Sequence, residues 1–312
     1  MRTLLIAATG GHLAELVKLR ERLPLEEAPT WVTFKSEQAD TLLRGERVLH
    51  VHEVNPRGYV NLARNLPIAH RVIRSGEFVR AISNGAGIAL AFLPLARAHG
   101  LEAHYIENAA RVEGPSLTGR LLELVPGVRL HAQYERLARG RWRYAGSIFD
   151  AFEPASAPRR GGPLRIAVTV GTLPYSFRRL IERLLAILPK DAEVVLWQTG
   201  WTPLDGLGVD GRRLVPPSDL SMALQAADVV VQHGGIGSAL QALEAGKRPV
   251  MVPRRERFGE HVDDHQEQVA RELARRGLAL MRHVDDLHTE DILQAAELGV
   301  RAVAVPPPLV LA

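Results

Sequence analysis

The chain has 312 residues, of which 46% are hydrophobic and 24% charged. This length corresponds to two domains of about 150 residues each. The composition is that of a globular protein and excludes a disordered, collagen-like or coiled-coil chain. The sequence contains no cysteine, which excludes disulfides, thiolate nucleophiles, iron–sulfur clusters and cysteine-ligated zinc. A net charge of +4 is too weak to indicate a nucleic-acid partner.

The chain opens with a short apolar run at residues 3–8, which leads directly into the glycine turn Thr9-Gly10-Gly11-His12. A run of this length is too short for the core of a signal peptide. The longest later apolar run, residues 86–96, contains Pro94 and falls well below the ~20 residues of a membrane span. We therefore expect a cytoplasmic protein that touches a membrane only through an apolar or basic surface.

Short apolar runs alternate with amphipathic stretches through the first half of the chain. The pattern predicts strands at residues 3–8, 30–34, 47–52, 81–83 and 103–107, and helices at residues 12–23, 62–75 and 87–99. Strands that alternate with helices in this way predict a parallel sheet with helices on both faces.

Residues 153–163 are the best linker, because they combine proline, glycine and small residues without an apolar period. We therefore expect an N-terminal domain over residues 1–155 and a C-terminal domain over residues 164–312. In the second domain the pattern predicts strands at residues 165–170, 193–198, 229–232 and 249–252, and helices at residues 177–188, 218–227, 238–245 and 265–276. The predicted fold class is α/β, with two doubly wound, Rossmann-like domains and the binding site in the cleft between them.

The strongest functional motif follows the strand at residues 229–232. It reads His233-Gly234-Gly235-Ile236-Gly237-Ser238 and leads directly into a helix. Glycines allow the backbone to approach an anion, and the N–H groups and dipole at a helix start hold phosphate. We expect Ser238 to cap this helix and to donate to a phosphate oxygen. The alternative is a tight strand-to-helix turn that binds nothing.

Two more glycine turns follow the first strand of each half. His12 lies where the turn at residues 9–12 enters its helix, and a histidine there suits a general base near neutral pH. A histidine without a role at a helix start is the alternative. The turn Val170-Gly171-Thr172 offers further backbone donors. Neither turn has the glycine spacing of a dinucleotide-binding motif.

The segment at residues 259–266 is rich in charged residues and histidine. One interpretation is that Asp264 or Gln266 binds sugar hydroxyls. A second is that His261, Asp263 and His265 bind a metal, although their spacing matches no standard motif. A third is a solvated helix N-terminus with acidic caps.

A polar segment also follows the strand at residues 103–107. We expect Glu107 and Arg111 to face the cleft. An internal ion pair is the alternative.

Together these motifs resemble a known group of glycosyltransferases. The first half resembles the membrane-recruiting subunit of the two-part GlcNAc transferase that extends dolichol-linked chitobiose, at residues 9–12, 84–87, 106–112 and 116–120. The second half resembles the catalytic subunit of that enzyme, at residues 168–172, 233–238, 245–254 and 264–266. Residues 259–266 resemble bacterial exopolysaccharide transferases, and the overall layout is similar to the GlcNAc transferase that makes lipid II.

The resemblance implies a GT-B fold and an inverting transfer that uses neither metal nor cofactor. The second half would hold a UDP-sugar donor, and the first half a polyprenyl-diphosphate-linked acceptor at the inner face of the cytoplasmic membrane. In this assignment His12 is the base, and the acceptor residues are Gly11, Asn84, Glu107 and Arg111. The donor residues are Gly171, Thr172, His233, Gly234, Gly235, Gly237, Ser238, Gln241, Asp264 and Gln266.

One residue departs from the pattern of the family. Eight positions after His233, many relatives have an acid that binds both ribose hydroxyls, whereas this chain has Gln241. A glutamine can still hydrogen-bond a hydroxyl, but without the strength of a charge-assisted bond. Two alternatives therefore stay open: a non-catalytic protein that binds sugar nucleotides, and a UDP-sugar epimerase of the same architecture.

Two groups of residues are candidates for contact with a membrane surface. Arg57, Arg64, Arg71 and Arg74 would face lipid phosphates, with a solvated helix face as the alternative. The apolar residues 88–95 would either rest against the bilayer or pack in the core.

Overall fold

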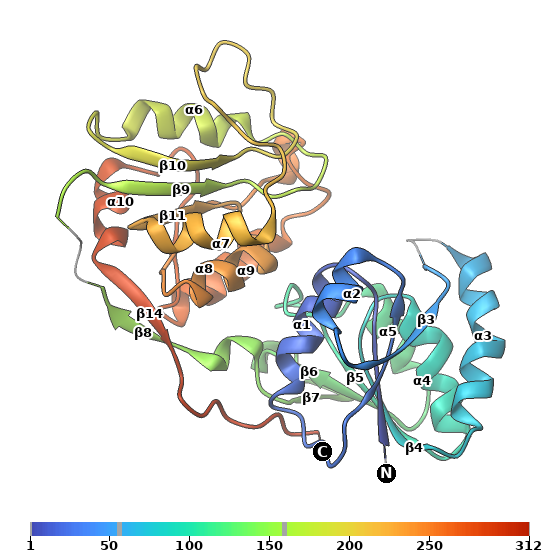
Figure 1. Cartoon of the computed structure of the whole chain (residues 1–312). Helices are drawn as coiled ribbons and strands as arrows, with labels where there is room; N and C mark the ends of the chain where they lie inside the picture. Colours follow the sequence, from blue (N-terminus) through green and yellow to red (C-terminus); the bar gives the residue numbers. More distant parts are fainter. Residues whose placement is uncertain (1, 55–57, 158–160, 312) are drawn as a thin grey trace. The chain divides into compact units, whose positions relative to one another are not determined.

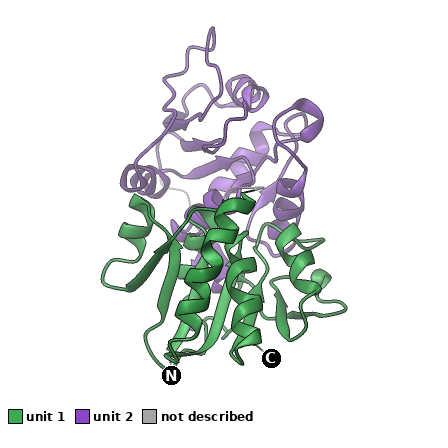
Figure 2. Cartoon of the chain, turned by 90° about the vertical axis from the view of Figure 1, so that its right-hand side faces the viewer, with its two compact units in different colours: residues 1–150, 306–312 green, residues 151–305 purple. Residues whose placement is uncertain are grey.

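The computed structural model describes residues 2–54, 58–157 and 161–311, which form two compact units (Figures 1 and 2). Unit 1 comprises residues 1–150 and 306–312, and unit 2 comprises residues 151–305. Among the described residues, no helix is both long and apolar enough to cross a membrane.

Unit 1 is built on a seven-stranded parallel sheet with the order β3-β2-β1-β4-β5-β6-β7. The strand order reverses between β1 and β4, and in such sheets ligands bind beyond the carboxyl ends of the strands at this reversal. The strands are β1 (Arg2–Ala7), β2 (Thr30–Phe34), β3 (Arg47–Val51), β4 (Phe78–Gly85), β5 (Glu102–Ile106), β6 (Val128–Ala132) and β7 (Trp142–Tyr144).

The helices of unit 1 connect these parallel strands. They are α1 (Gly11–Arg20), α2 (Glu37–Leu42), α3 (Tyr59–Ile73), α4 (Ile88–Ala98) and α5 (Leu117–Glu123). Helix α4 is apolar almost all round, and Ile88, Phe92 and Leu93 are completely buried. Residues 88–95 therefore pack in the core, and the suggestion that they rest against a bilayer is wrong.

Unit 2 has a five-stranded parallel sheet with the order β10-β9-β11-β12-β13. Its strand order reverses between β9 and β11. The strands are β9 (Arg165–Thr169), β10 (Glu193–Gln198), β11 (Val229–Gln232), β12 (Val250–Met251) and β13 (Leu280–Met281). The helices are α6 (Arg178–Ile187), α7 (Pro217–Ala226), α8 (Ile236–Glu244), α9 (His265–Arg275) and α10 (Thr289–Ala296).

Alternation along the strands explains how the helices cover the unit 2 sheet. Ile166 and Val168 of β9 pack in one cluster with residues of α6 and α10. Ala167, between them, packs in a second cluster with residues of α7 and α8. Since successive side chains of a strand point to opposite faces, both faces of the sheet are buried, as the apolar strand sequences predict.

The predicted linker is in part a strand. Residues Phe152–Ser156 form β8, which pairs antiparallel with β14 (Leu298–Ala302) in a two-stranded sheet. Such a sheet has only edge strands, and an edge strand tolerates Pro154. Residues 158–160 of the predicted linker lie outside the described residues.

The C-terminal segment returns to unit 1, so the predicted C-terminal domain over residues 164–312 extends too far. The Leu309 N–H donates to the Arg22 carbonyl at 2.8 Å, and Arg22 Nε donates to the Pro307 carbonyl at 2.7 Å. Leu309 is buried in unit 1. No local sequence motif predicts that the C-terminal segment packs on unit 1, because this packing depends on contacts between residues nearly 300 positions apart.

Candidate functional site

His12 lies at the strand-order reversal of unit 1, in the first turn of α1. Its Nδ1 is 2.9 Å from the Asn84 carbonyl oxygen, and Asn84 Nδ2 donates back to the His12 carbonyl at 2.7 Å. Because a carbonyl oxygen can only accept, Nδ1 carries the proton and the lone pair lies on Nε2. Burial lowers the pKa of His12, and the Arg111 guanidinium lowers it further, although the bond to Asn84 partly opposes this. The ring is therefore neutral at pH 7, as a general base requires.

A buried acid supports the turn beside His12. Glu15 accepts from Asn108 Nδ2 at 2.6 Å and from the Ala109 N–H at 3.1 Å, and burial raises its pKa to about 8. Asn108 Nδ2 is also 3.4 Å from His12 Nδ1. Glu15 thus fixes the position of a neighbour of the base. The sequence analysis missed it, although an acid one helical turn after His12 on the apolar side of α1 was a signal.

Asn84 and Glu107, which the resemblance assigns to the acceptor, lie in the interior of unit 1. Both side chains are completely buried. Asn84 holds His12, and Glu107 accepts from the Ser116 N–H at 2.8 Å and the Asn108 N–H at 3.0 Å. These side chains hold the turns of unit 1 together, whereas we expected them to contact an acceptor. Gly11 is exposed and Arg111 partly buried, so acceptor contact by these two stays a prediction.

His233 fills the strand-order reversal of unit 2. Its side chain is only 7% exposed, and its ring lies between two glycines. A Cβ on Gly171 would lie 2.7 Å from the ring, and one on Gly235 would lie 2.5 Å from Nε2. Burial and the nearby Arg254 lower the pKa of His233 to about 3. The glycines are thus needed here to make room for a neutral imidazole.

Helix α8 begins two residues earlier than predicted. Gly235 is its N-cap residue and Ile236 its first residue, so Ser238 lies in the first turn and is not the cap. The backbone N–H groups of a first turn have no intrahelical acceptor, and they favour an anion. Thr172 and Gly237 are exposed beside the two turns. Their contact with a donor diphosphate stays a prediction, as it does for Gly234.

Of the two residues predicted to bind the donor sugar, Asp264 lies at the surface and Gln266 in the interior. The Asp264 side chain is 42% exposed, and its Oδ1 accepts from the Glu256 N–H at 2.9 Å. Gln266 is 2% exposed, and its Oε1 accepts from the Arg254 N–H at 3.2 Å. Gln266 is therefore more buried than we expected of a sugar-binding residue, while Asp264 remains accessible.

Arg254 is a functional candidate that appeared in the sequence analysis only within a motif. Its side chain is completely buried, and Nη2 donates to the carbonyls of Val170 at 2.6 Å and Tyr175 at 3.0 Å. Within the described part of the chain, Nε and Nη1 have no hydrogen-bond partner. Burial lowers the pKa of Arg254 to about 10, so it stays charged at pH 7. It therefore places a positive charge under the Gly171 turn.

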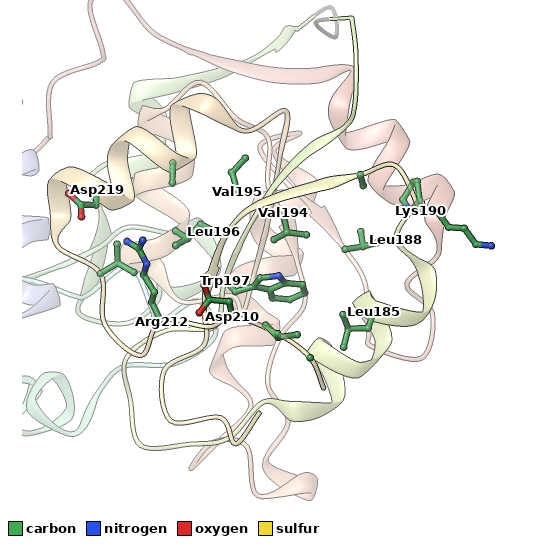
Figure 3. Close-up of a pocket in the computed structure, with 16 residues that line it drawn as sticks. Leu185, Leu188, Lys190, Val194, Val195, Leu196, Trp197, Asp210, Arg212 and Asp219 are labelled. Atoms are coloured by element: carbon green, nitrogen blue, oxygen red, sulfur yellow. The ribbon is translucent and has the colours of Figure 1, made fainter. Parts of the chain in front are cut away.

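Unit 2 has a small cavity of about 240 Å³ between α7 and α8, which is lined by Gln241 and Glu244, among others. A larger one of about 670 Å³ lies along edge strand β10, with Leu185, Trp197 and Arg212 in its lining (Figure 3). Only the smaller cavity is lined by a predicted donor residue, Gln241.

Residues 165–301 match the glycosyltransferase family 28 C-terminal domain. The family 28 match covers the sheet of unit 2, the His233 turn and the segment with Asp264 and Gln266. It lies on the half of the chain for which the sequence motifs predicted donor binding. The predicted resemblance to this group of glycosyltransferases is thus confirmed.

Curated proteins similar to this chain are named UDP-N-acetylglucosamine--N-acetylmuramyl-(pentapeptide) pyrophosphoryl-undecaprenol N-acetylglucosamine transferases. The one from Paracidovorax citrulli (strain AAC00-1) is 30% identical over 172 residues, which are 51% of this chain and 47% of the relative. The one from Cupriavidus necator is 30% identical over 192 residues, which are 57% of this chain and 52% of the relative. The chain thus spans about half the length of these relatives.

Solved structures resemble nearly the whole chain. MurG from Acinetobacter baumannii has a TM-score of 0.62 at 19% identity and covers 94% of this chain and 89% of its own. The glycosyltransferase SnogD from Streptomyces nogalater has a TM-score of 0.57 at 22% identity and covers 95% of this chain and 90% of its own. These neighbours confirm the predicted GT-B fold, with two Rossmann-like α/β domains.

Proposed function

We propose that this chain is an inverting glycosyltransferase. It moves GlcNAc or another hexose from a UDP-sugar to a polyprenyl-diphosphate-linked acceptor in cell-surface polysaccharide synthesis. The observation that carries the proposal is the presence, in one chain, of the family 28 match over residues 165–301 and of His12, whose tautomer places a lone pair on Nε2. The similar curated proteins are named as N-acetylglucosamine transferases that act on a pyrophosphoryl-undecaprenol acceptor.

The proposed role of His12 is that of the base. Nε2 takes the proton of the acceptor hydroxyl as its oxygen attacks the anomeric carbon of the donor sugar. The new carbon–oxygen bond forms on the face opposite the leaving UDP, which departs with the electron pair of the broken bond. A neutral ring is needed for this step, and burial keeps the pKa of His12 below its usual value.

The proposed transfer takes no metal ion. The first turn of α8 supplies backbone N–H groups and the positive end of a helix dipole for the leaving diphosphate. Arg254 adds a buried positive charge under the neighbouring Gly171 turn. The transfer further requires that donor and acceptor are aligned and that water is excluded from the reacting atoms.

We place the membrane-facing surface on α3. Tyr59 and Val60 are 73% and 66% exposed, and Arg64, Arg71 and Arg74 are exposed as well. Positions 60, 64, 67, 71 and 74 follow at intervals of three or four and therefore share one face. A face that combines apolar and arginine side chains suits peripheral association with the anionic inner face of the cytoplasmic membrane. Arg57 lies outside the described residues.

The experiment that tests the function is a UDP-release assay. It uses a panel of UDP-sugars with polyprenyl-diphosphate saccharides in vesicles, on the wild type and on His12→Ala. We expect lipid-dependent release with one sugar, and a large loss in the variant. Release with no dependence on the lipid acceptor contradicts the proposed acceptor.

The pH profile of UDP release tests the base. Because the pKa of His12 is lowered and the ring must be neutral, we expect the acid limb of the profile below pH 6.5. The rate falls as the pH drops through the pKa and the ring takes up a proton. An acid limb well above pH 6.5 would remove His12 from this role.

Gln241 favours a second candidate function, that of a non-catalytic protein that binds sugar nucleotides. Glutamine stands where many relatives have an acid, and it lines the small cavity between α7 and α8. UDP-sugar binding by calorimetry without release of UDP, with every acceptor of the panel, would support this candidate.

A further inference from the structure

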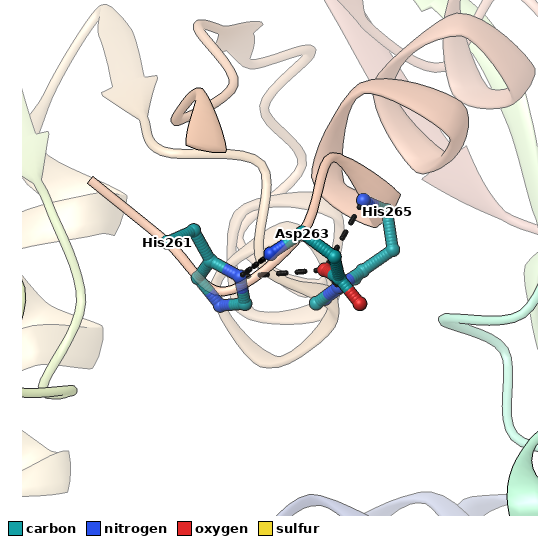
Figure 4. A group of neighbouring side chains, drawn as sticks. All are labelled: His261, Asp263 and His265. Atoms are coloured by element: carbon teal, nitrogen blue, oxygen red, sulfur yellow. Dashed lines mark hydrogen bonds and ion pairs between the residues drawn. The ribbon is translucent and has the colours of Figure 1, made fainter. Parts of the chain in front are cut away.

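The segment that leads into α9, together with the first residue of that helix, brings three side chains of metal-ligating types together: His261, Asp263 and His265 (Figure 4). Their ligand atoms, a ring nitrogen from each histidine and a carboxylate oxygen, all lie within 4.8 Å of one another. His261 Nδ1 is 3.4 Å from Asp263 Oδ1, and His265 Nδ1 contacts the same oxygen. Two imidazoles and a carboxylate are ligands typical of Zn²⁺ and other first-row transition metals.

The separations suit a metal ion. Ligand atoms at about 2.0–2.1 Å from a tetrahedral Zn²⁺ lie about 3.3 Å from one another. The distance of 3.4 Å between His261 Nδ1 and Asp263 Oδ1 matches this value. His265 has only to turn its ring away from the carboxylate for the three atoms to surround an ion. The His265 side chain is 22% exposed, so part of it faces solvent.

One ligand of the cluster is buried, whereas the other two are partly exposed to solvent. His261 is 7% exposed, and its ring lies against Tyr175 with the ring centroids 5.4 Å apart. The side chains of Asp263 and His265 are 40% and 22% exposed, which leaves a path for an ion. One ligand is thus fixed by packing, and the other two can adjust.

A helix cap explains only part of this arrangement. Asp263 Oδ1 is 3.4 Å from the His265 N–H, as in a turn that starts a helix. Such a turn needs one backbone donor and no imidazole. Here two imidazole rings approach the same carboxylate oxygen, with their centroids 4.8 Å apart. A helix cap therefore does not explain why two imidazole rings and a carboxylate come together here.

We propose that His261, Asp263 and His265 bind one divalent transition-metal ion, with Zn²⁺ as the best fit, and that the ion fixes the turn before α9. Asp264 and Gln266 flank His265 in the sequence. An ion therefore restrains the two residues assigned to the donor sugar. The proposed transfer itself takes no ion, so the metal site and the transferase function stand or fall separately.

The test is a titration of the metal-stripped full chain with Co²⁺, followed by its visible absorption, and then displacement by Zn²⁺. We expect one equivalent of Co²⁺ to bind with a tetrahedral spectrum. Asp263→Asn removes a ligand with little change in packing, and we expect it to weaken binding by at least about tenfold. His261→Ala with His265→Ala removes two ligands and should abolish the spectrum.

The matched control is His70→Ala with His99→Ala. These histidines also lie together, with ring nitrogens 3.2 Å apart, but on the exposed surface of unit 1. We expect this variant to bind Co²⁺ as the wild type does. No tetrahedral spectrum in the wild type, or equal Co²⁺ binding by the wild type and Asp263→Asn, overturns the proposal, and so does the loss of binding in the control variant. Circular dichroism confirms that each variant is folded, and no step of the titration requires donor or acceptor.

Discussion

Each unit has a histidine beside a glycine turn at the strand-order reversal of its sheet, yet the two histidines are placed in opposite ways. His12 follows its glycines, lies in the first turn of α1 and keeps its Nε2 lone pair. His233 precedes its glycines, directly follows β11 and is enclosed by Gly171 and Gly235. The histidine that follows its glycines, His12, thus has a ring that suits catalysis. The histidine that precedes its glycines, His233, has a ring that packs inside the turn.

The physical reason lies in where the side chain leaves the backbone. His12, after its glycines, lies in the first turn of a helix, where backbone N–H groups without an intrahelical acceptor also lie. His233, directly after a strand and before its glycines, lies against the Gly171 turn of the neighbouring strand, where its ring is enclosed. His12 and His233 have similar motifs but different surroundings, and four predictions test this contrast.

The largest effect is expected from replacing the two histidines in turn. His12→Ala should lower UDP release by about 10²–10⁴-fold, because the acceptor loses its base. His233→Ala should instead destabilise unit 2 by about 1–3 kcal/mol, because it leaves a void between two glycines. Urea unfolding and single-turnover UDP release measure the two effects. If His233→Ala left stability unchanged and lost as much activity as His12→Ala, the assignment of a packing role to His233 would be wrong.

Replacing Arg254 tests the support beneath the donor turn. Arg254→Met removes the donor to the Val170 and Tyr175 carbonyls, which are two hydrogen bonds from a charged group. We expect a loss of about 1.5–3 kcal/mol in the free energy of unfolding, with a higher KM for the UDP-sugar. The control Arg257→Met, at an exposed position, should change neither. Equal effects of the two substitutions on stability and on KM would show that Arg254 does not support the donor turn.

Two glycines of the same turn provide a matched pair. Gly235→Ala places a Cβ 2.5 Å from His233 Nε2, so the ring or the turn must shift, at a cost of about 1–3 kcal/mol. Gly237→Ala meets nothing within 4 Å and should stabilise α8 by about 0.5–1 kcal/mol. Thermal unfolding distinguishes the two. Similar melting temperatures for both variants would mean that the ring does not require Gly235.

The smallest effect concerns the acid behind His12. Burial raises the pKa of Glu15 from its usual 4.5 to about 8, so the folded protein binds a proton that the unfolded chain releases. The stability from this group is present below pH 4.5 and is lost as the pH rises to about 8. We expect the free energy of unfolding to fall less steeply between pH 5 and 8 in Glu15→Gln than in the wild type.

The control for this measurement is Glu21→Gln. Glu21 is an exposed residue at the end of the same helix. Its variant should keep the slope of the wild type. An unchanged slope in Glu15→Gln would show that Glu15 is ionised in the folded protein.

Much of the fold was predictable because it depends on local patterns. The strand at residues 30–34 and the strand at residues 193–198 were predicted with the bounds that the structure has. The elements that were not predicted include the five-residue strand β6 and the eight-residue helix α10, and also very short strands, such as β13 with two residues and β7 with three. A strand of that length carries no readable period, and only its neighbours in the sheet define it.

The candidate site was predicted less completely than the fold. The turns that carry His12, Gly171 and His233 were found from their glycines, since a glycine after an apolar strand indicates a sharp turn. The buried roles of Asn84 and Glu107 were not found. A polar residue beside such a turn has the same appearance in the sequence whether it faces a ligand or the interior.

The sequence by itself determined the order of strands and helices, the glycine turns and the resemblance to a family of transferases. These follow from apolar periodicity and from the freedom of glycine, which act over a few residues. Only the tertiary structure decided that Asn84 orients His12 and that Glu15 holds Asn108. Those partners are 72 and 93 positions apart and meet only when the parallel sheet brings β1, β4 and β5 together.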